Sequence, residues 1–166
     1  MPSVRISKEY ISGIYYLTFT VRNWYYLFDR HHRFEILADS LMYCQKHKGL
    51  TLYAYVFMLN HIHLIALAPD MIAFVRDFKK FTSKEMQKNI IATEPNVLRL
   101  FDRGNGTYEF WEKTNMPKVI KSEAYVIQKI NYIHANPVRK QYVKSPEDWV
   151  WSSANGESKI KVESVL

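Results

Sequence analysis

With 166 residues, of which 48% are hydrophobic, the chain is long enough for one globular domain with its own core. It has no apolar run long enough to span a bilayer and no signal peptide, and the single Cys44 excludes an internal disulfide and a thiolate zinc site. We therefore expect a cytoplasmic protein without a membrane partner, and the formal charge of +7 favours a polyanionic partner such as nucleic acid.

The first part of the chain reads as strand, helix, strand and strand. Residues 15–21 are aromatic and β-branched, which is typical of a strand. Asp29 is placed to cap a helix that runs to about Lys48, with apolar residues at helical spacing. Residues 53–68 then predict two strands that meet at positions 59–60.

A loop of one cation, one asparagine and three aromatic residues, positions 22–26, follows the first strand. Such a mixture suits stacking on nucleic acid bases. Half-buried loop aromatics are the commoner explanation, so the loop stays open between the two readings.

The second predicted helix, from the cap Asp70 to about Asn89, carries an apolar stripe and a basic stripe. The basic residues, with one neighbouring lysine, are Arg76, Lys79, Lys80, Lys84 and Lys88. A solvated face is the ordinary explanation of such a stripe. However, like charges at this spacing repel and few acids lie among them, so we expect this face to contact DNA phosphates.

The remaining elements complete an α+β fold. Residues 92–108 predict a loop with one short helical turn, and residues 110–120 contain an irregular fourth strand. Ser122 caps a third helix, which should end near Asn136 because Pro137 disfavours helix at the residue before it.

The order β-α-β-β-α-β-α is the split βαβ (ferredoxin-like) plan with one added helix. It predicts one antiparallel sheet with helices packed on one face and an added C-terminal helix. We expect a single domain over residues 1–154 and a polar C-terminal tail over residues 155–166 that frays.

Two histidines open the third predicted strand. His61 and His63 lie on the same strand face, with Cβ atoms about 6.6 Å apart, while Ile62 faces the core. This spacing allows one metal ion to bind both imidazoles. Taken alone, however, the pair is better explained as two structural histidines with local partners.

The third helix places a tyrosine away from its apolar arc. On a helical wheel the arc consists of Val126, Ile127, Ile130 and Ile133. Tyr132 lies opposite the arc, with Asn136 one turn further on, and His134 points about 200° away from Tyr132, where it should pack or bond locally. A lone tyrosine on a polar face is more often a surface residue than a nucleophile.

In combination these residues resemble a known family. The run Met58-Leu59-Asn60-His61-Ile62-His63, followed by Tyr132-Ile133-His134-Ala135-Asn136-Pro137-Val138-Arg139, is similar to the single-tyrosine HUH transposases of insertion sequences. The most similar branch is the REP-associated tyrosine transposases, which residues 146–153 also resemble. The resemblance spans roughly residues 15–153.

The resemblance implies a metal-dependent enzyme that cleaves and rejoins single-stranded DNA near hairpin or repeat sequences, as a homodimer or a monomer. It implies that His61, His63 and Asn136 bind Mg²⁺ or Mn²⁺. Tyr132 would be the nucleophile that forms a 5′-phosphotyrosine bond and releases a 3′-hydroxyl. Arg139, in the same motif, would contact the DNA.

Residue chemistry agrees with this role but leaves parts of it open. A metal ion can polarise a phosphate and stabilise the charge on its oxygens, and two imidazoles also accept Zn²⁺, Ni²⁺ or Cu²⁺. A phenol is a weak nucleophile at neutral pH without a nearby cation or base. Lys129 is the nearest such cation, and the sequence contains no evident general base.

Two departures from the family pattern stand out. Leu59 replaces the usual proline before the Asn-His pair, which should loosen that turn, and residues 112–117 match the pattern less well. Rolling-circle initiators usually carry a second tyrosine near the first, and relaxases place their tyrosine before the histidines. The main alternative is a domesticated protein that binds a DNA hairpin without cleaving it. An RNA-binding sheet of the aromatic-platform type would leave both histidines unexplained.

Overall fold

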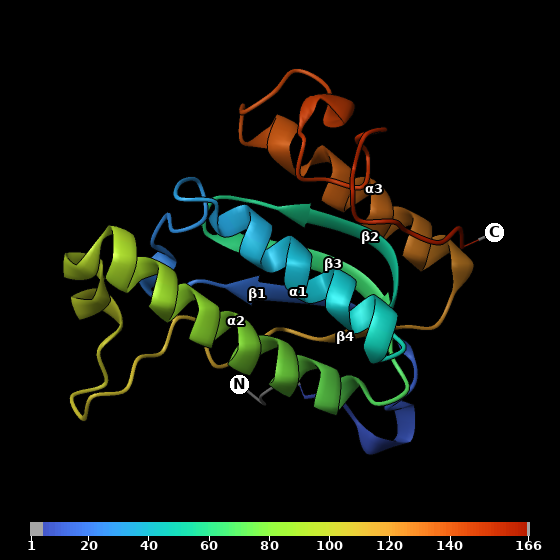
Figure 1. Cartoon of the computed structure of the whole chain (residues 1–166). Coiled ribbons are helices and arrows are strands. Elements are labelled where there is room, and N and C mark those ends of the chain that lie inside the picture. Colours follow the sequence, from blue (N-terminus) through green and yellow to red (C-terminus); the bar gives the residue numbers. More distant parts are fainter. Residues whose placement is uncertain (1–4, 166) are drawn as a thin grey trace.

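The computed structural model describes residues 5–165 and contains a four-stranded antiparallel sheet with three long helices (Figure 1). The strands pair in the order β2-β3-β1-β4, which is the split βαβ arrangement, so the predicted fold class is confirmed. The strands and long helices are β1 (Ile14–Thr20), α1 (Arg33–His47), β2 (Thr51–Phe57), β3 (His61–Leu67), α2 (Met71–Thr93), β4 (Lys118–Ile120) and α3 (Glu123–Arg139). The short 3₁₀ turns are η1 (Lys8–Tyr10), η2 (Arg22–Trp24), η3 (Pro95–Phe101) and η4 (Pro146–Asp148).

The sheet separates two hydrophobic clusters, because successive strand residues face opposite sides. Leu17 and Phe19 pack with α1 and α2 on one face, in the larger cluster. Tyr16 and Ile65 pack with Val126 and Ile133 of α3 on the other face. Figure 1 shows α1 and α2 in front of the sheet, with α3 set apart from them on the side of β2. The added helix therefore covers the face that the first two helices leave open.

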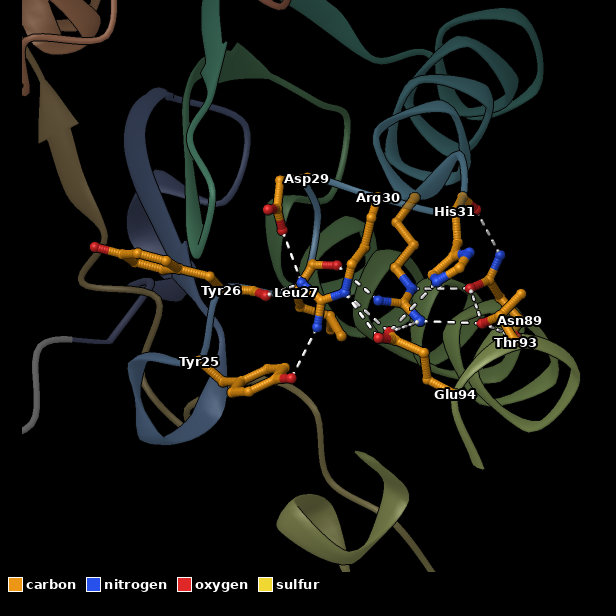
Figure 2. A network of polar contacts seen from close by, with 10 residues as sticks. Tyr25, Tyr26, Leu27, Asp29, Arg30, His31, Asn89, Thr93 and Glu94 are labelled. Carbon is orange, nitrogen blue, oxygen red and sulfur yellow. Dashed lines mark hydrogen bonds and ion pairs between the residues drawn. The ribbon is translucent and has the colours of Figure 1, made fainter. Parts of the chain in front are cut away.

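Helix α1 begins at Arg33 and not at the predicted cap Asp29. His31 and His32 adopt left-handed backbone conformations, with φ of 57° and 60°, so the helix cannot begin earlier. The cause is a charged network behind this turn (Figure 2). Arg33 is fully buried, and Glu94 accepts an ion pair from it at 2.8 Å and from Arg30 at 2.9 Å. A buried guanidinium needs such a partner, which Glu94 supplies from the end of α2.

The same network lengthens α2 beyond its predicted end near Asn89. Asp70 caps the helix as predicted, since its carboxylate accepts from the backbone N–H of Ala73 at 2.9 Å. At the other end Arg33 donates to the side chains of Asn89 and Thr93, which holds the last turn in helical form as far as Thr93. The predicted short helical turn in the following loop is η3.

Helix α3 begins as predicted, with the Ser122 hydroxyl accepting from the N–H of Tyr125 at 3.1 Å, but it does not end at Asn136. It continues through Pro137 to Arg139. Proline removes one N–H from the helix, but this loss falls in the last turn. The turn is closed by the N–H of Lys140 on the carbonyl of Asn136 at 3.1 Å, and Asn136 and Pro137 are both buried.

The turn between β2 and β3 is held by the loop that follows β1. The Leu59 carbonyl accepts from the N–H groups of Leu27 and Phe28, each at 3.1 Å, and the Asn60 carbonyl accepts from Val21 at 2.8 Å. Leu59 in place of proline therefore does not leave this turn without support.

Residues 155–165 of the segment predicted as a fraying tail pack instead, and Leu166 lies outside the described residues. Ile160 is buried in the larger cluster, and the N–H of Glu163 donates to the Leu52 carbonyl of β2 at 2.8 Å. Ahead of it, Ser153 donates to the Tyr55 carbonyl at 3.0 Å and the Trp151 carbonyl accepts from Phe57 at 2.8 Å. Ile160 provides the buried anchor of this largely polar stretch, together with backbone hydrogen bonds that the sequence does not reveal.

Candidate active site

The two histidines and two threonines form a polar strip across β1 and β3. His63 is paired with Thr18 in the strand register and His61 is paired with Thr20. These residues face α3, because the alternate residues Phe19 and Ile62 belong to the cluster under α1 and α2. The strip therefore interrupts the apolar face at its end nearest the β2–β3 turn.

Asn60 fixes the tautomer of His61. The Asn60 amide nitrogen donates to the Trp24 carbonyl at 3.1 Å, which leaves its oxygen, 2.8 Å from Nδ1 of His61, as the acceptor. Nδ1 must then carry the proton and Nε2 carries the lone pair. The side-chain nitrogen of Asn136 lies 3.5 Å from this Nε2, and a 180° rotation of that amide exchanges its nitrogen for its oxygen.

His63 is held by two hydroxyl groups. Its Nδ1 lies 3.1 Å from the Tyr16 hydroxyl and 3.0 Å from that of Thr18, and the Tyr16 ring stacks on the imidazole with centroids 5.4 Å apart. The imidazole centroids of His61 and His63 are 4.8 Å apart. When Nδ1 of His63 donates its proton to one of these hydroxyls, Nε2 keeps the free lone pair; histidines that bind metal usually donate their other ring N–H in this way.

Burial keeps both imidazoles neutral. It lowers the pKa of His61 to about 4, with a smaller contribution from Lys140, and it lowers the pKa of His63 to about 3, assisted by His61, Arg139 and Lys129. Burial also raises the pKa of Tyr16 to about 12, so its hydroxyl stays protonated. Near pH 7 a metal ion would therefore displace no proton from either imidazole.

Tyr132 reaches this strip from α3. Tyr132 is 44% exposed, and its ring centroid lies 6.1 Å from that of His63 and 6.4 Å from that of Tyr16. The guanidinium carbon of Arg139 lies 4.1 Å from the ring centroid and the Lys129 ammonium lies 5.3 Å from it. The structure thus brings Tyr132, Arg139, Asn136 and both histidines into one place.

The buried arc of α3 differs from the predicted one. Val126 and Ile133 are buried as expected, but Ile127 is exposed and Asn136 is only 5% exposed. The helix is rotated toward its polar side, so Tyr132 lies at the edge of the buried arc and not opposite it. The polar residues of the sheet need hydrogen-bond partners where they are buried, and this rotation brings the polar side of α3 toward them. His134 bonds locally as predicted, with Nε2 at 2.7 Å from the Ser153 hydroxyl.

The two histidines, Tyr132 and Asn136 line an open cavity of about 540 Å³. Its lining consists of Thr18, Thr20, Trp24, His61, His63, Glu112, Thr114, Met116, Tyr132, Asn136 and Lys140. Sequence reasoning missed most of the rim. The alternation of Thr18 and Thr20 with apolar neighbours could have indicated a polar strand face, whereas nothing in the sequence indicates that Glu112 reaches this cavity.

The donor set at the cavity fits a divalent ion with some ligands from outside the protein. The described part of the chain contains no group of three His, Cys, Asp or Glu side chains placed to hold a metal. Two imidazoles and, after rotation of its amide, the oxygen of Asn136 are the candidate protein ligands, and the open cavity would leave coordination positions for water or phosphate oxygens. Imidazole suits Mn²⁺, Zn²⁺ or Ni²⁺, and the amide oxygen suits Mg²⁺ or Mn²⁺.

The predicted basic stripe lies on the opposite face of the sheet, because α2 packs there with α1. Lys79 is turned inward and donates to the carbonyls of Glu112 at 3.2 Å and Lys113 at 3.0 Å, so it supports the segment that forms one cavity wall. Arg76 pairs with Asp77, and Lys88 pairs with Glu85. DNA contact by this stripe stays a prediction.

Lys80 and Lys84 line a separate groove between α1 and α2, together with the exposed rings of Tyr43 and Phe81. Within residues 5–165 neither lysine forms an ion pair. This groove is the part of the stripe with cations available to a polyanion.

Comparison with known proteins places the fold. No family model matches the chain, and no curated protein matches it in sequence. The structure is similar to that of a REP-associated tyrosine transposase bound to a REP hairpin, with a TM-score of 0.71 and 20% identity over 99% of this chain and 92% of that one. A Deinococcus radiodurans R1 protein proposed to be a transposase matches with a TM-score of 0.49 and 19% identity, over 78% of this chain and 95% of that one.

Among the described residues, no helix combines the length and apolar character needed to cross a membrane. The fold match extends over nearly the whole of this chain. The structural comparison therefore confirms the resemblance inferred from sequence: the chain has the fold of a REP-associated tyrosine transposase.

Proposed function

We propose that the protein cleaves and rejoins single-stranded DNA through Tyr132, in a reaction that depends on a divalent metal ion held by His61, His63 and Asn136. The observation that carries the proposal is the convergence of β3 and α3 on one cavity. A half-exposed phenol and two neutral imidazoles there share a polar, cation-flanked space. Structural histidines would need neither the tyrosine nor the opening.

The chain's own residues supply positioning and charge. His61 is oriented by Asn60, and His63 is oriented by Tyr16 and Thr18. Mg²⁺ or Mn²⁺ bound by these imidazoles would supply positive charge to the non-bridging oxygens of the scissile phosphate. Lys129 and Arg139 add two further cations beside the Tyr132 ring, where a phosphate would lie during attack.

In the cleavage step the Tyr132 hydroxyl oxygen forms a bond to phosphorus and the bond from phosphorus to the 3′-oxygen breaks. The phenol proton passes to solvent, which reaches the half-exposed ring, and the departing 3′-oxygen takes up a proton. The product is a 5′-phosphotyrosine and a free 3′-hydroxyl. Attack by another 3′-hydroxyl reverses the step and joins the strands without ATP, because the covalent bond keeps the phosphodiester energy.

We further propose that a DNA hairpin with a single-stranded flank is the substrate, recognised by a monomer or a homodimer. Support comes from the basic composition of the chain and from its fold similarity to a transposase bound to a REP hairpin. A binding protein that no longer cleaves is the second candidate. It is favoured by the observation that the described part of the chain contains no group of three His, Cys, Asp or Glu side chains placed to hold a metal.

The test is incubation with labelled single-stranded DNA that carries the hairpins flanking the gene, in Mn²⁺ and in chelator. The products are then separated on a denaturing gel. A protease-sensitive band of lower mobility that needs the metal and is absent in Tyr132→Phe would support the proposal. Tight hairpin binding without such a band would support the binding protein instead.

A further inference from the structure

The loop that follows β1 carries two non-glycine residues in the left-handed backbone region. Asn23 has φ of 62° and Trp24 has φ of 57°. Asparagine is often found there, but a tryptophan in this region is rare because its Cβ crowds the following carbonyl. Strained conformations of this kind persist where the surroundings enforce them, and they concentrate at functional sites.

Four hydrogen bonds hold the left-handed backbone of Asn23 and Trp24 in place. The Trp24 N–H donates to the Val21 carbonyl at 3.0 Å, and the Trp24 carbonyl accepts from Asn60 at 3.1 Å. The Asn23 N–H donates to the Glu112 carboxylate at 3.2 Å, and its side chain donates to the Leu100 carbonyl at 3.3 Å. The backbone of this loop is therefore held in place by hydrogen bonds and forms a fixed platform.

This loop leaves the Trp24 side chain exposed to solvent. Trp24 is 66% exposed, whereas Trp111 is buried and Trp149 and Trp151 are partly covered. Trp24 lines the same cavity as His61 and Tyr132. Met116 lines the cavity as well, is 53% exposed, and also has a left-handed backbone, with φ of 44°. Two exposed apolar side chains on strained backbone thus border a cavity whose other lining residues all carry polar groups.

We propose that Trp24 and Met116 form a stacking subsite for one unpaired base of single-stranded DNA, next to the phosphate at Tyr132. The proposal rests on the proposed function, which places that phosphate. Flat, unpaired bases stack on exposed aromatic rings without regard to sequence, and the Met116 thioether suits the second face of such a base. A paired base offers no free face, so the subsite selects single strands.

Asn60 connects this subsite to the histidines. One end of its amide bonds the Trp24 carbonyl and the other bonds His61. A single side chain therefore ties the backbone that carries the indole to the imidazole of His61. A base that stacks on Trp24 is held at a set distance from the ligand residues, which positions the phosphate in the cavity.

The experiment combines protein variants with abasic DNA. Hairpin oligonucleotides carry one abasic site at each position of the single-stranded flank in turn, and their affinities are measured for wild type, Trp24→Leu and Trp24→Phe. Base–aromatic stacking changes affinity by roughly 5- to 100-fold per base. We expect one position where the abasic site weakens wild-type binding by this factor and has little further effect in Trp24→Leu, with Trp24→Phe close to wild type.

Acrylamide quenching of tryptophan fluorescence gives a second readout. Single-stranded DNA should protect the one exposed tryptophan, and duplex DNA of the same sequence should not. Additive effects of Trp24→Leu and every abasic site, with no protection, would overturn the subsite while leaving the Tyr132 adduct intact. Equal protection by single-stranded RNA would overturn the assignment to DNA.

The two proposals fail separately. If the wild type forms no Tyr132 adduct yet shows the coupled loss at one base, cleavage is refuted and the stacking subsite stands. Melting temperatures of both Trp24 variants within a few degrees of wild type would show that the loop keeps its fold.

Discussion

The side-chain nitrogen of Asn136 on α3 lies 3.5 Å from Nε2 of His61 on β3, across 75 positions of sequence. This contact joins the two halves of the sequence motif, and Asn136 is buried although it is polar. A buried amide without a partner is costly. The contact with His61 therefore gives the amide of Asn136 a polar partner in this buried position.

Replacing Tyr132 by phenylalanine should abolish the covalent DNA adduct and all strand cleavage. Only the hydroxyl is lost, and the ring keeps its contacts with Arg139 and His63, so affinity for the DNA hairpin should stay within about twofold of wild type. Gel-shift titrations and denaturing gels measure the two properties separately. A large loss of hairpin affinity in this variant would contradict the nucleophile role.

Replacing Asn60 by alanine should weaken Mn²⁺ binding roughly 10- to 100-fold, since His61 loses the acceptor that fixes its tautomer. Isothermal titration of the DNA-free protein measures the affinity. Asn60→Asp keeps an oxygen acceptor for Nδ1 and serves as the matched control, with affinity near wild type or higher. Equal losses in both variants would show that the amide supports the loop and not the ligand.

Acid should destabilise the metal-free protein because of the two buried histidines. The pKa values of His61 and His63 are lowered to about 4 and about 3, while the unfolded chain has the ordinary value near 6.5. The unfolded state therefore binds more protons below pH 6.5, and stability falls as the pH drops from 6.5 to about 4. Each imidazole contributes a slope of up to about 1.4 kcal/mol per pH unit.

Urea unfolding at pH 7.5, 6.0 and 5.0 tests this dependence. The variant with His61 and His63 both replaced by asparagine should show a shallower slope than wild type over that range. An unchanged slope would mean that other groups dominate acid unfolding.

Removing the cations of Arg76, Lys80 and Lys84 together should weaken hairpin binding and flatten its salt dependence. If all three contact phosphates of single strands, the slope of log affinity against log salt should fall by about 2. The control removes three charges elsewhere, at Lys46, Lys159 and Lys161, which line a different surface. Equal slopes for wild type and the Arg76, Lys80 and Lys84 variant would place the DNA on the α3 face alone.

The sequence was informative where periodicity and caps determine structure. The strand order, the caps Asp70 and Ser122, and the shared face of the two histidines all follow from local patterns that the structure confirms. The start of α1 could not be predicted, because it depends on a buried arginine meeting Glu94, 61 positions further along the chain. Long-range ion pairs leave no local pattern.

The same distinction holds for the candidate site. His61, His63, Tyr132 and Asn136 were predicted from a motif and the fold brings them together, whereas their chemical roles stay predictions. Trp24 and Glu112 were not assigned to the site, because hydrogen bonds between loops distant in sequence place them there, and Asn60 was part of the motif but was given no role. The helical wheel also misjudged α3, since it weighs apolar residues only and the sheet opposite is partly polar.

The chain after α3 has a consequence for assembly. Residues 151–163 occupy the outer backbone groups of β2, at Leu52, Tyr55 and Phe57. Unpaired strand edges invite further strands, and here that edge is already capped by the protein's own C-terminal segment. A second copy could not continue the sheet across β2, so a homodimer would have to form through another surface. Truncation before Ser158 would expose part of this edge and favour self-association.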